Sequence, residues 1–336
     1  MPAILYGKLW EEPMSFTRHM IAATVLALSS TTAWAGDMML RIATQLSGTV
    51  NWELTTLHER GFDTANGFRL EVQDVAAGPA AQVAFQAGEV DAIVSDWLWV
   101  ARKRAEGEDY VFIPYSRAVG ALHVPKDSKA QGLADLKGGK IGIAGGPVDK
   151  SWLILRAYSR KELGFELQEA TEQVFGAPPL IFETALAGEL DGAVNFWHFG
   201  AKMEAAGMRP LITVAEAGAA LGLDPDTPLL GYVVRGDLLR DKPALVQGFA
   251  AASRATKEVL ATDDAAWQAL RPLMNAKTDA QFEALKAGFR AGIPAPGPVD
   301  EAAAGRLLAI MADLGGADLV GKMDSLPGGV FLAPGG

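Results

Sequence analysis

Short apolar runs alternate with amphipathic, helix-like stretches along most of this chain. The runs have strand length and end at turn residues, and the expected strands of the first series are 40–46, 68–75, 110–115 and 120–125. A helix is expected over 52–60, because Thr49 or Asn51 can cap its first turn. This β-α-β rhythm predicts a parallel sheet with short crossovers, and hence an α/β fold.

The pattern then restarts and later returns to its first form. Near Asp135 the second series begins, and its strand over 140–144 is expected to lead into a helix that opens near Asp149. A further strand is expected at 210–214. The apolar run at 229–234 repeats the character of the last strand of the first series, and helical patterns follow it.

This restart and return predict two αβ lobes joined by two hinge strands. Residues 36–125 together with 229–336 are expected to form lobe 1, and residues 126–228 are expected to form lobe 2. The two extended crossings are expected near 124–126 and 228–231. Two lobes joined in this way can close over a ligand.

An eleven-residue stretch occurs twice, 100 positions apart. Residues 87–97 read AGEVDAIVSDW and residues 187–197 read AGELDGAVNFW, with six identical pairs. Each copy follows a helical segment and passes through a glycine into a short apolar strand. Ligands of open α/β sheets bind beyond the carboxyl ends of the strands. The repeat therefore predicts an aromatic-lined cleft between facing strand ends, with core packing of the tryptophans as the alternative.

The candidate ligand-binding residues lie at the predicted strand ends, helix starts and hinges: Ser47, Gly48, Trp52, Asp96, Trp97, Gly146, Lys150, Trp152, Asn195, Trp197, His198 and Tyr232. Tryptophan rings can stack on flat groups or hold cations. Asp96 can bind an amine, or it can instead cap the following helix. The glycine turn before Lys150 opens a helix whose free amides suit a polar oxygen. Lys150 itself either reaches the ligand or is solvated.

Composition excludes several classes of function. The 336 residues include 30 basic and 40 acidic side chains, a net charge of −10, with no basic cluster for nucleic acid or anionic lipid. The chain has no cysteine, which excludes disulfides, thiolate metal sites and cysteine nucleophiles. The four histidines lack metal-ligand spacing, and no Ser-His-Asp order is evident. We therefore expect no catalytic residue, metal or cofactor.

The N-terminal segment is typical of a secretory signal peptide. A basic stretch at 14–20, an apolar run at 21–30 and an A-x-A site at 33–35 follow in the usual order, with Met14 as the expected initiator. We expect cleavage after Ala35 and a periplasmic product, so residues 1–35 are assigned to the signal. A retained membrane anchor is the alternative, but the apolar run is shorter than the ~20 residues that a spanning helix needs.

Three segments carry a resemblance to a known family. They are LRIATQL at 40–46, LADLKGGKIGIAGGPVDKSWLILRAY at 133–158 and ETALAGELDGAVNFW at 183–197. They resemble the nitrate/taurine/thiamine-precursor group (NMT1/THI5-like, SsuA-like) of periplasmic binding proteins, over essentially all of 37–330. The resemblance implies a type II periplasmic-binding-protein fold. It also implies a non-enzymatic, monomeric receptor that delivers a small solute to the permease and ATPase of an ABC importer.

The ligand is less defined than the family. One enzymatic branch of the group uses a cysteine-rich iron motif, which this chain lacks. Relatives that bind small anions use hydroxyls, amides and a basic residue, whereas Asp96 here stands among tryptophans, which favours a small organic solute. An accessory protein of the same fold, serving a partner oxidoreductase or binding a metal, is an alternative. A hydrolase or lyase using Asp96 and His198 is a third.

Overall fold

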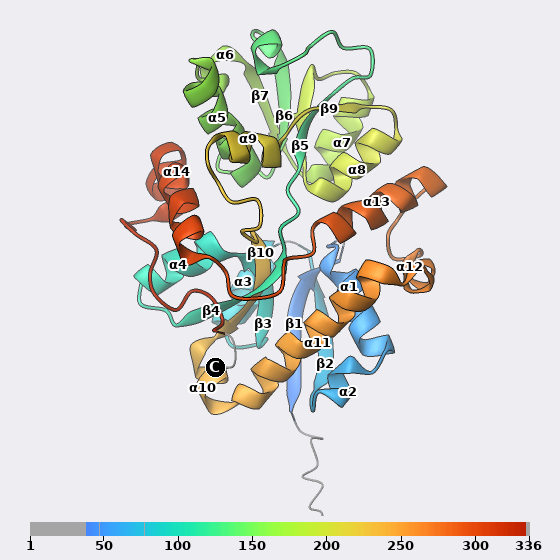
Figure 1. Ribbon diagram of the computed structural model, residues 1–336, viewed down its shortest axis with the longest axis vertical. Coiled ribbons are helices and arrows are strands. Elements are labelled where there is room, and N and C mark those ends of the chain that lie inside the picture. The colour runs from blue at the N-terminus through green and yellow to red at the C-terminus, as the bar shows by residue number, and fades with distance from the viewer. Residues whose placement is uncertain (1–37, 47, 77, 334–336) are drawn as a thin grey trace, which may run out of the picture. The chain divides into compact units, whose positions relative to one another are not determined.

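The computed structural model describes residues 38–46, 48–76 and 78–333 (Figure 1). The expected signal peptide, its cleavage site and Ser47 lie outside these residues. Ten strands form two five-stranded sheets within the described part of the chain. None of the helices found there is long and apolar enough to cross a lipid bilayer.

The first sheet has the strand order β2-β1-β3-β10-β4. Its strands are β1 (Met39–Gln45), β2 (Arg69–Val75), β3 (Ala92–Asp96), β4 (Tyr110–Ser116) and β10 (Leu230–Arg235). The second sheet has the order β7-β6-β8-β5-β9. Its strands are β5 (Ala121–Val124), β6 (Lys140–Ala144), β7 (Glu172–Gly176), β8 (Gly192–Val194) and β9 (Arg209–Thr213).

The helices between these strands begin and end as follows: α1 (Val50–Glu59), α2 (Phe62–Ala65), α3 (Gly78–Gln86), α4 (Trp97–Ala105), α5 (Lys150–Leu163), α6 (Leu167–Ala170), α7 (Pro178–Leu186), α8 (Trp197–Ala205) and α9 (Val214–Ala220). After β10 the chain is helical: α10 (Gly236–Asp241), α11 (Pro243–Thr262), α12 (Asp264–Leu270), α13 (Asp279–Ala291) and α14 (Glu301–Val320). A short 3₁₀ helix, Leu133–Leu136, precedes β6.

The expected strands are found within a residue or two of their bounds, but the expectation of a wholly parallel sheet is wrong. β10 runs antiparallel to β3 and β4, and β5 runs antiparallel to β8 and β9. The reason is connectivity. A strand that arrives from the other sheet enters at the carboxyl edge of the parallel strands, so it must run in the opposite direction.

The first crossing also lies earlier than expected. We expected residues 120–125 to stay with the first series, near a hinge at 124–126. β5 instead pairs with β8 and β9, so the chain leaves the first sheet between Ser116 and Ala121. The return lies between β9 and β10. The bounds of the two lobes themselves stay a prediction.

Three hydrophobic clusters hold these elements together. One packs α1, α11, α12 and α13 on a face of the first sheet, around Trp52, Trp267 and Phe249. A small cluster packs α7 and α8 on the second sheet. The third contains residues of both sheets, such as Ile93 and Ile143, and α14 contributes Met311 to it. The faces of the two sheets that the first two clusters leave uncovered therefore share one core.

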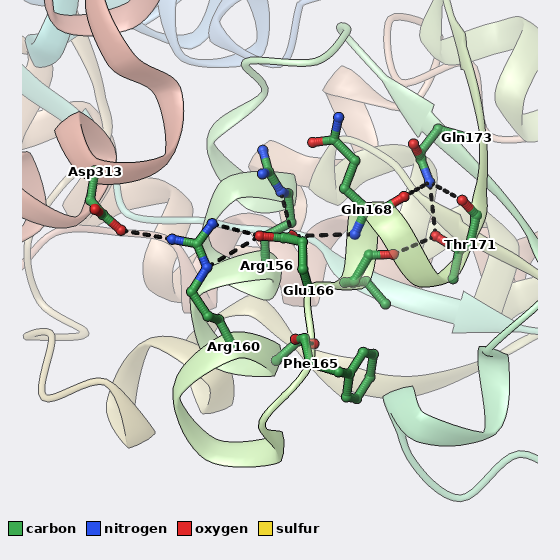
Figure 2. Close-up of polar contacts among 10 residues, drawn as sticks. Arg156, Arg160, Phe165, Glu166, Gln168, Thr171, Gln173 and Asp313 are labelled. Carbon is green, nitrogen blue, oxygen red and sulfur yellow. Dashed lines mark hydrogen bonds and ion pairs between the residues drawn. The ribbon is translucent and has the colours of Figure 1, made fainter.

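Charged side chains also connect α14 to the second sheet's helices (Figure 2). Glu166, at the start of α6, accepts hydrogen bonds from Arg156 at 2.9 Å and from Arg160 at 2.6 Å, both on α5. Arg160 also donates to Asp313 of α14 at 3.0 Å. Burial alone would raise the pKa of Glu166, but the hydrogen bonds from Arg156 and Arg160 outweigh it and lower that pKa.

Candidate functional site

The two copies of the repeat fold as the same unit. α3, β3 and α4 form the first copy, and α7, β8 and α8 form the second. Gly88 and Gly188 end the preceding helices with φ of +76° in both cases, a left-handed conformation that favours glycine. The repeat thus places the carboxyl ends of β3 and β8 at equivalent positions in the two sheets.

Asp91 and Asp191, the aspartates of the repeat, each form hydrogen bonds with the backbone of a neighbouring strand. Asp91 donates its backbone N–H to the carbonyl of Arg41 at 2.8 Å, and its carboxylate accepts the N–H of Arg41 at 3.0 Å. Asp191 makes the same pair of bonds to Lys140, at 2.9 and 2.8 Å. These residues fix strand positions, so part of the repeat's identity is structural.

Asp96 joins the two strand-end regions. Its Oδ1 accepts the N–H of Trp99 at 2.9 Å and so caps α4. Helix capping was the alternative role that the sequence offered for this residue. Its Oδ2 lies 2.9 Å from Nζ of Lys150, at the start of α5 in the other series. Asp96 therefore caps α4 and also pairs with a lysine of the chain, and its contact with a solute stays a prediction. Lys150 is paired rather than solvated.

Asp149 lies beside this ion pair. Its carboxylate caps α5 by accepting the N–H of Trp152 at 3.0 Å. Burial raises its pKa to about 6, against the opposing effects of that hydrogen bond and of Lys150. Gly145 and Gly146 form the preceding turn with φ of +92° and +112°, a left-handed conformation that favours glycine.

The predicted tryptophans have different surroundings. Trp97 and Trp152 are completely buried, and Trp97 packs against Phe331 with ring centroids 5.9 Å apart. Both rings belong to the core shared by the two sheets. They show the core packing that was the alternative reading, and a role for them in ligand contact stays a prediction.

Trp197 is only half-buried and packs against the cluster on the first sheet that contains Trp52. Its ring contacts Trp52 of α1 edge to face, with ring centroids 6.1 Å apart. A helix that packs on the second sheet therefore contacts a helix that packs on the first. His198 follows it and packs on Phe199 with centroids 4.7 Å apart. Burial, helped by the nearby charge of Lys202, lowers the pKa of His198 to about 4, so the ring is neutral near pH 7.

The remaining candidates are occupied by local bonds. Asn195 donates to the carbonyl of Pro178 at 2.9 Å and accepts the N–H of Phe196 at 2.8 Å. Gly48 closes a turn by donating to the carbonyl of Gln45 at 2.8 Å. Contact of these two residues with a solute stays a prediction.

Tyr232 belongs to a buried polar network that the sequence did not suggest. Its hydroxyl donates to Glu53 at 2.9 Å, and Glu53 also accepts from Ser253 at 2.6 Å and pairs with Lys257 at 2.7 Å. All four are buried. The available signal was Lys257 itself, which interrupts the apolar stripe of α11. Its partner, Glu53 on α1, is distant in the chain, so their pairing could not be predicted from the sequence.

A cavity of about 600 Å³ lies beside the two crossing segments. Arg117, Ala118 and Val119 line it from the first crossing, and Thr227 and Leu229 line it from the second. Helices α5, α8, α9, α13 and α14 supply most of the other walls. Of the predicted ligand residues within the described chain, only Trp197 lines it.

The structure offers no evident metal centre. Among the described residues, no three His, Asp or Glu side chains gather as metal ligands.

Comparison with known proteins now identifies the family. A model of the family described as NMT1/THI5 like matches residues 54–266. The chain belongs to the NMT1/THI5-like family. No curated protein matches this NMT1/THI5-like chain significantly in sequence.

Solved structures share the fold of this NMT1/THI5-like protein at low identity. The periplasmic aliphatic sulphonate binding protein SsuA from Escherichia coli has 18% identity and a TM-score of 0.66, covering 85% of this chain and 94% of that one. The alkanesulfonate-binding protein SsuA from Xanthomonas axonopodis pv. citri, bound to MOPS, has 18% identity and a TM-score of 0.67, covering 88% and 98%.

A third match extends the likeness to another source. The ligand-binding component of an ABC-type import system from Staphylococcus aureus, with zinc bound, has 13% identity and a TM-score of 0.63, covering 82% of this chain and 91% of that one. The expected type II periplasmic-binding-protein fold is confirmed, with two mixed sheets in place of the parallel sheet that was expected.

Proposed function

We propose that this protein is the periplasmic solute-binding component of an ABC importer, which carries a small organic solute to a membrane permease. Family membership and the fold shared with sulfonate-binding proteins support this role. The proposal includes export by the N-terminal signal and action as a monomer without cofactor. It leaves the solute open among amines, pyrimidines and sulfonates.

The observation that carries the proposed site is the ion pair between Asp96 and Lys150. It lies where the carboxyl end of β3 faces the start of α5, which is where ligands of such sheets bind. Lys150 is 30% exposed and Asp96 17% in their side chains, so both can reach a solute. An anionic group of the solute would replace Asp96 as the partner of Lys150. An amine of the solute would replace Lys150 as the partner of Asp96.

The surrounding groups suit the rest of a small solute. The glycine turn at 145–146 shortly precedes Asp149 and Lys150 in the chain, and half-buried Trp197 supplies aromatic surface where it packs on Trp52 of α1. We propose that the two sheets belong to lobes that close over the solute and that the crossing segments act as hinges. Ser47, Gly48, Gly146 and Asn195 are proposed as its polar wall.

The test begins with a ligand screen of the mature protein. Thermal shift against amines, sulfonates, pyrimidines, amino acids and metal ions should yield a stabilising solute, because binding only the folded state raises stability. Calorimetric titration then compares Lys150→Met and Asp96→Asn, which keeps the α4 cap. Loss of a charge-assisted hydrogen bond should weaken binding by about 10–100-fold in one of them. Lys140→Met, at an exposed pair with Glu172, should bind as the wild type does.

Three results would each contradict a part of the proposal. Equal affinity in all variants would remove the site from Asp96 and Lys150 while leaving the importer role intact. Stabilisation by a metal ion alone, with no organic hit, would favour the accessory protein of the same fold. Turnover of a hit would favour a hydrolase or lyase, for which Asp96 and His198 remain the candidate residues.

A further inference from the structure

Asp96 and Phe196 occupy the same position in the two repeat copies but differ in chemistry. Each directly precedes a helix, α4 and α8 respectively, and each has an extended backbone. Asp96 caps its helix through its carboxylate, whereas Phe196 has no side-chain oxygen with which to do so. The second copy therefore lacks this cap and carries an aromatic ring at the strand end. A local rule is broken there without a gain to the helix, which indicates another role for the ring.

The ring of Phe196 lies beside the glycine turn that leads to Lys150. A Cβ placed on Gly145 would lie 3.6 Å from the Phe196 ring and 3.4 Å from Oδ2 of Asp149. Phe196 is 39% exposed, and it belongs to none of the three hydrophobic clusters of the described chain. An apolar group packed on this ring would remove exposed apolar surface from water, which is favourable.

The ion pair of Asp96 and Lys150 presents charges of both signs in one place. Nζ of Lys150 and Oδ2 of Asp96 are 2.9 Å apart, and both side chains keep some exposure to water. A solute with a single charge would replace one partner and leave the other without its counter-ion. Because both side chains are largely buried, that unmatched charge is unfavourable. A solute that carries both charges can pair with both side chains at once.

The short distance between the two charges limits the solute further. Solute groups that pair with Nζ of Lys150 and with Oδ2 of Asp96 must themselves lie close together. In an α-amino acid the ammonium nitrogen and the carboxyl carbon are about 2.5 Å apart, from standard bond lengths and angles. Charges at opposite ends of a long chain meet this spacing only if the chain folds back, which costs conformational entropy.

We propose that the solute is an α-amino acid with an apolar side chain. Its ammonium group pairs with Asp96, its carboxylate pairs with Lys150, and its side chain packs on Phe196. The inference rests on the importer role proposed above. Among the solutes which that role leaves open, it selects an amine that also carries a carboxylate. A singly charged solute would depend on either Asp96 or Lys150, whereas an amino acid depends on both.

Calorimetric titration of the mature protein with L-phenylalanine and three analogues tests each contact. Phenethylamine lacks the carboxylate, 3-phenylpropionate lacks the ammonium group, and L-alanine lacks the ring. L-phenylalanine should bind about 10–100-fold more tightly than either singly charged analogue, since each loses a charge-assisted hydrogen bond. It should bind about 3–10-fold more tightly than L-alanine, because part of the ring is buried on Phe196.

Three variants assign each contact to a side chain. Asp96→Asn, which keeps the α4 cap, should bind L-phenylalanine and 3-phenylpropionate with equal affinity. Lys150→Met should bind L-phenylalanine and phenethylamine equally. Phe196→Ser, which supplies a capping hydroxyl to α8, should bind L-phenylalanine and L-alanine equally. Circular dichroism checks that each variant folds.

Two matched controls lie away from the site. Leu163→Ala changes a side chain that is 41% exposed at the far end of α5, and Lys140→Met changes the exposed pair with Glu172. Both should keep the wild-type order of the four probes. Wild-type affinity for either singly charged analogue that equals its affinity for L-phenylalanine would overturn the inference. So would no binding of any probe up to about 10 mM. These results leave the importer role intact, which fails instead if the ligand screen yields no organic solute.

Discussion

Residues that are identical in the two repeat copies need not have the same structural role. Asp91 and Asp191 make the same reciprocal bonds to a neighbouring strand. Trp97 and Trp197 diverge, because Phe331 and the core around α14 cover the first ring, while Gly288 leaves the second beside a cavity. The divergence comes from helices far along the chain rather than from the repeat itself.

His198 should titrate far below an ordinary histidine. Its pKa of about 4 results from burial, with a smaller effect of the charge on Lys202. In the unfolded chain its pKa is near 6.5. The unfolded state therefore binds more protons below that value, so the contribution of His198 to stability is complete above about pH 6.5 and falls as the pH drops toward 4.

NMR titration of the His198 ring protons measures this directly, and His198→Gln assigns the resonance. The variant should also lose part of the acid dependence of unfolding between about pH 6.5 and 4. A midpoint above pH 6 would contradict the buried position described for the ring.

At the scale of elements, the contact of α5 with α6 depends on Glu166. Glu166→Gln removes the charge that holds Arg156 and Arg160 but keeps the side chain's shape. Its side chain is 12% exposed and that of Arg156 13%, so little water replaces the lost interaction. We expect a loss of about 2–4 kcal/mol in the free energy of unfolding at pH 7.

The pH dependence gives this prediction a second readout. Because the pKa of Glu166 is lowered in the folded state, its contribution is present above its ordinary value of 4.5 and is lost as the pH falls below that. Urea unfolding at pH 7 and pH 4 should show the wild type and variant converging in acid. Glu172→Gln, 67% exposed, is the control and should change stability by less than about 1 kcal/mol.

The elements themselves could largely be predicted from the sequence, whereas their pairing could not. The strand over 140–144 and the helix opening at Asp149 follow from local apolar periodicity and capping. The antiparallel insertion of β10 depends on where the chain re-enters the first sheet. Likewise, the pairing of Glu53 with Lys257 and that of Arg117 with Asp226 join distant segments, so no local pattern encodes them.

At the scale of the whole molecule, one hydrophobic cluster contains residues of both sheets. Met311 of α14 is completely buried in that cluster. Met311→Ala should cost about 2–5 kcal/mol. Because the cluster is shared, scanning calorimetry should show one unfolding transition shifted to lower temperature. Met39→Ala, 44% exposed, should leave the transition nearly unchanged. Two separated transitions in the wild type would contradict a common core.

The strand order of the first sheet has a consequence for synthesis. β10 lies between β3 and β4, yet it follows the whole second sheet in the chain. The strands of the second sheet are contiguous and can pair as they emerge, whereas β4 has no neighbour until β10 arrives. Non-local pairings of this kind form slowly. A nascent chain thus keeps its first core open until late, and in the export proposed above this would prolong the time in which a translocation machinery can thread it.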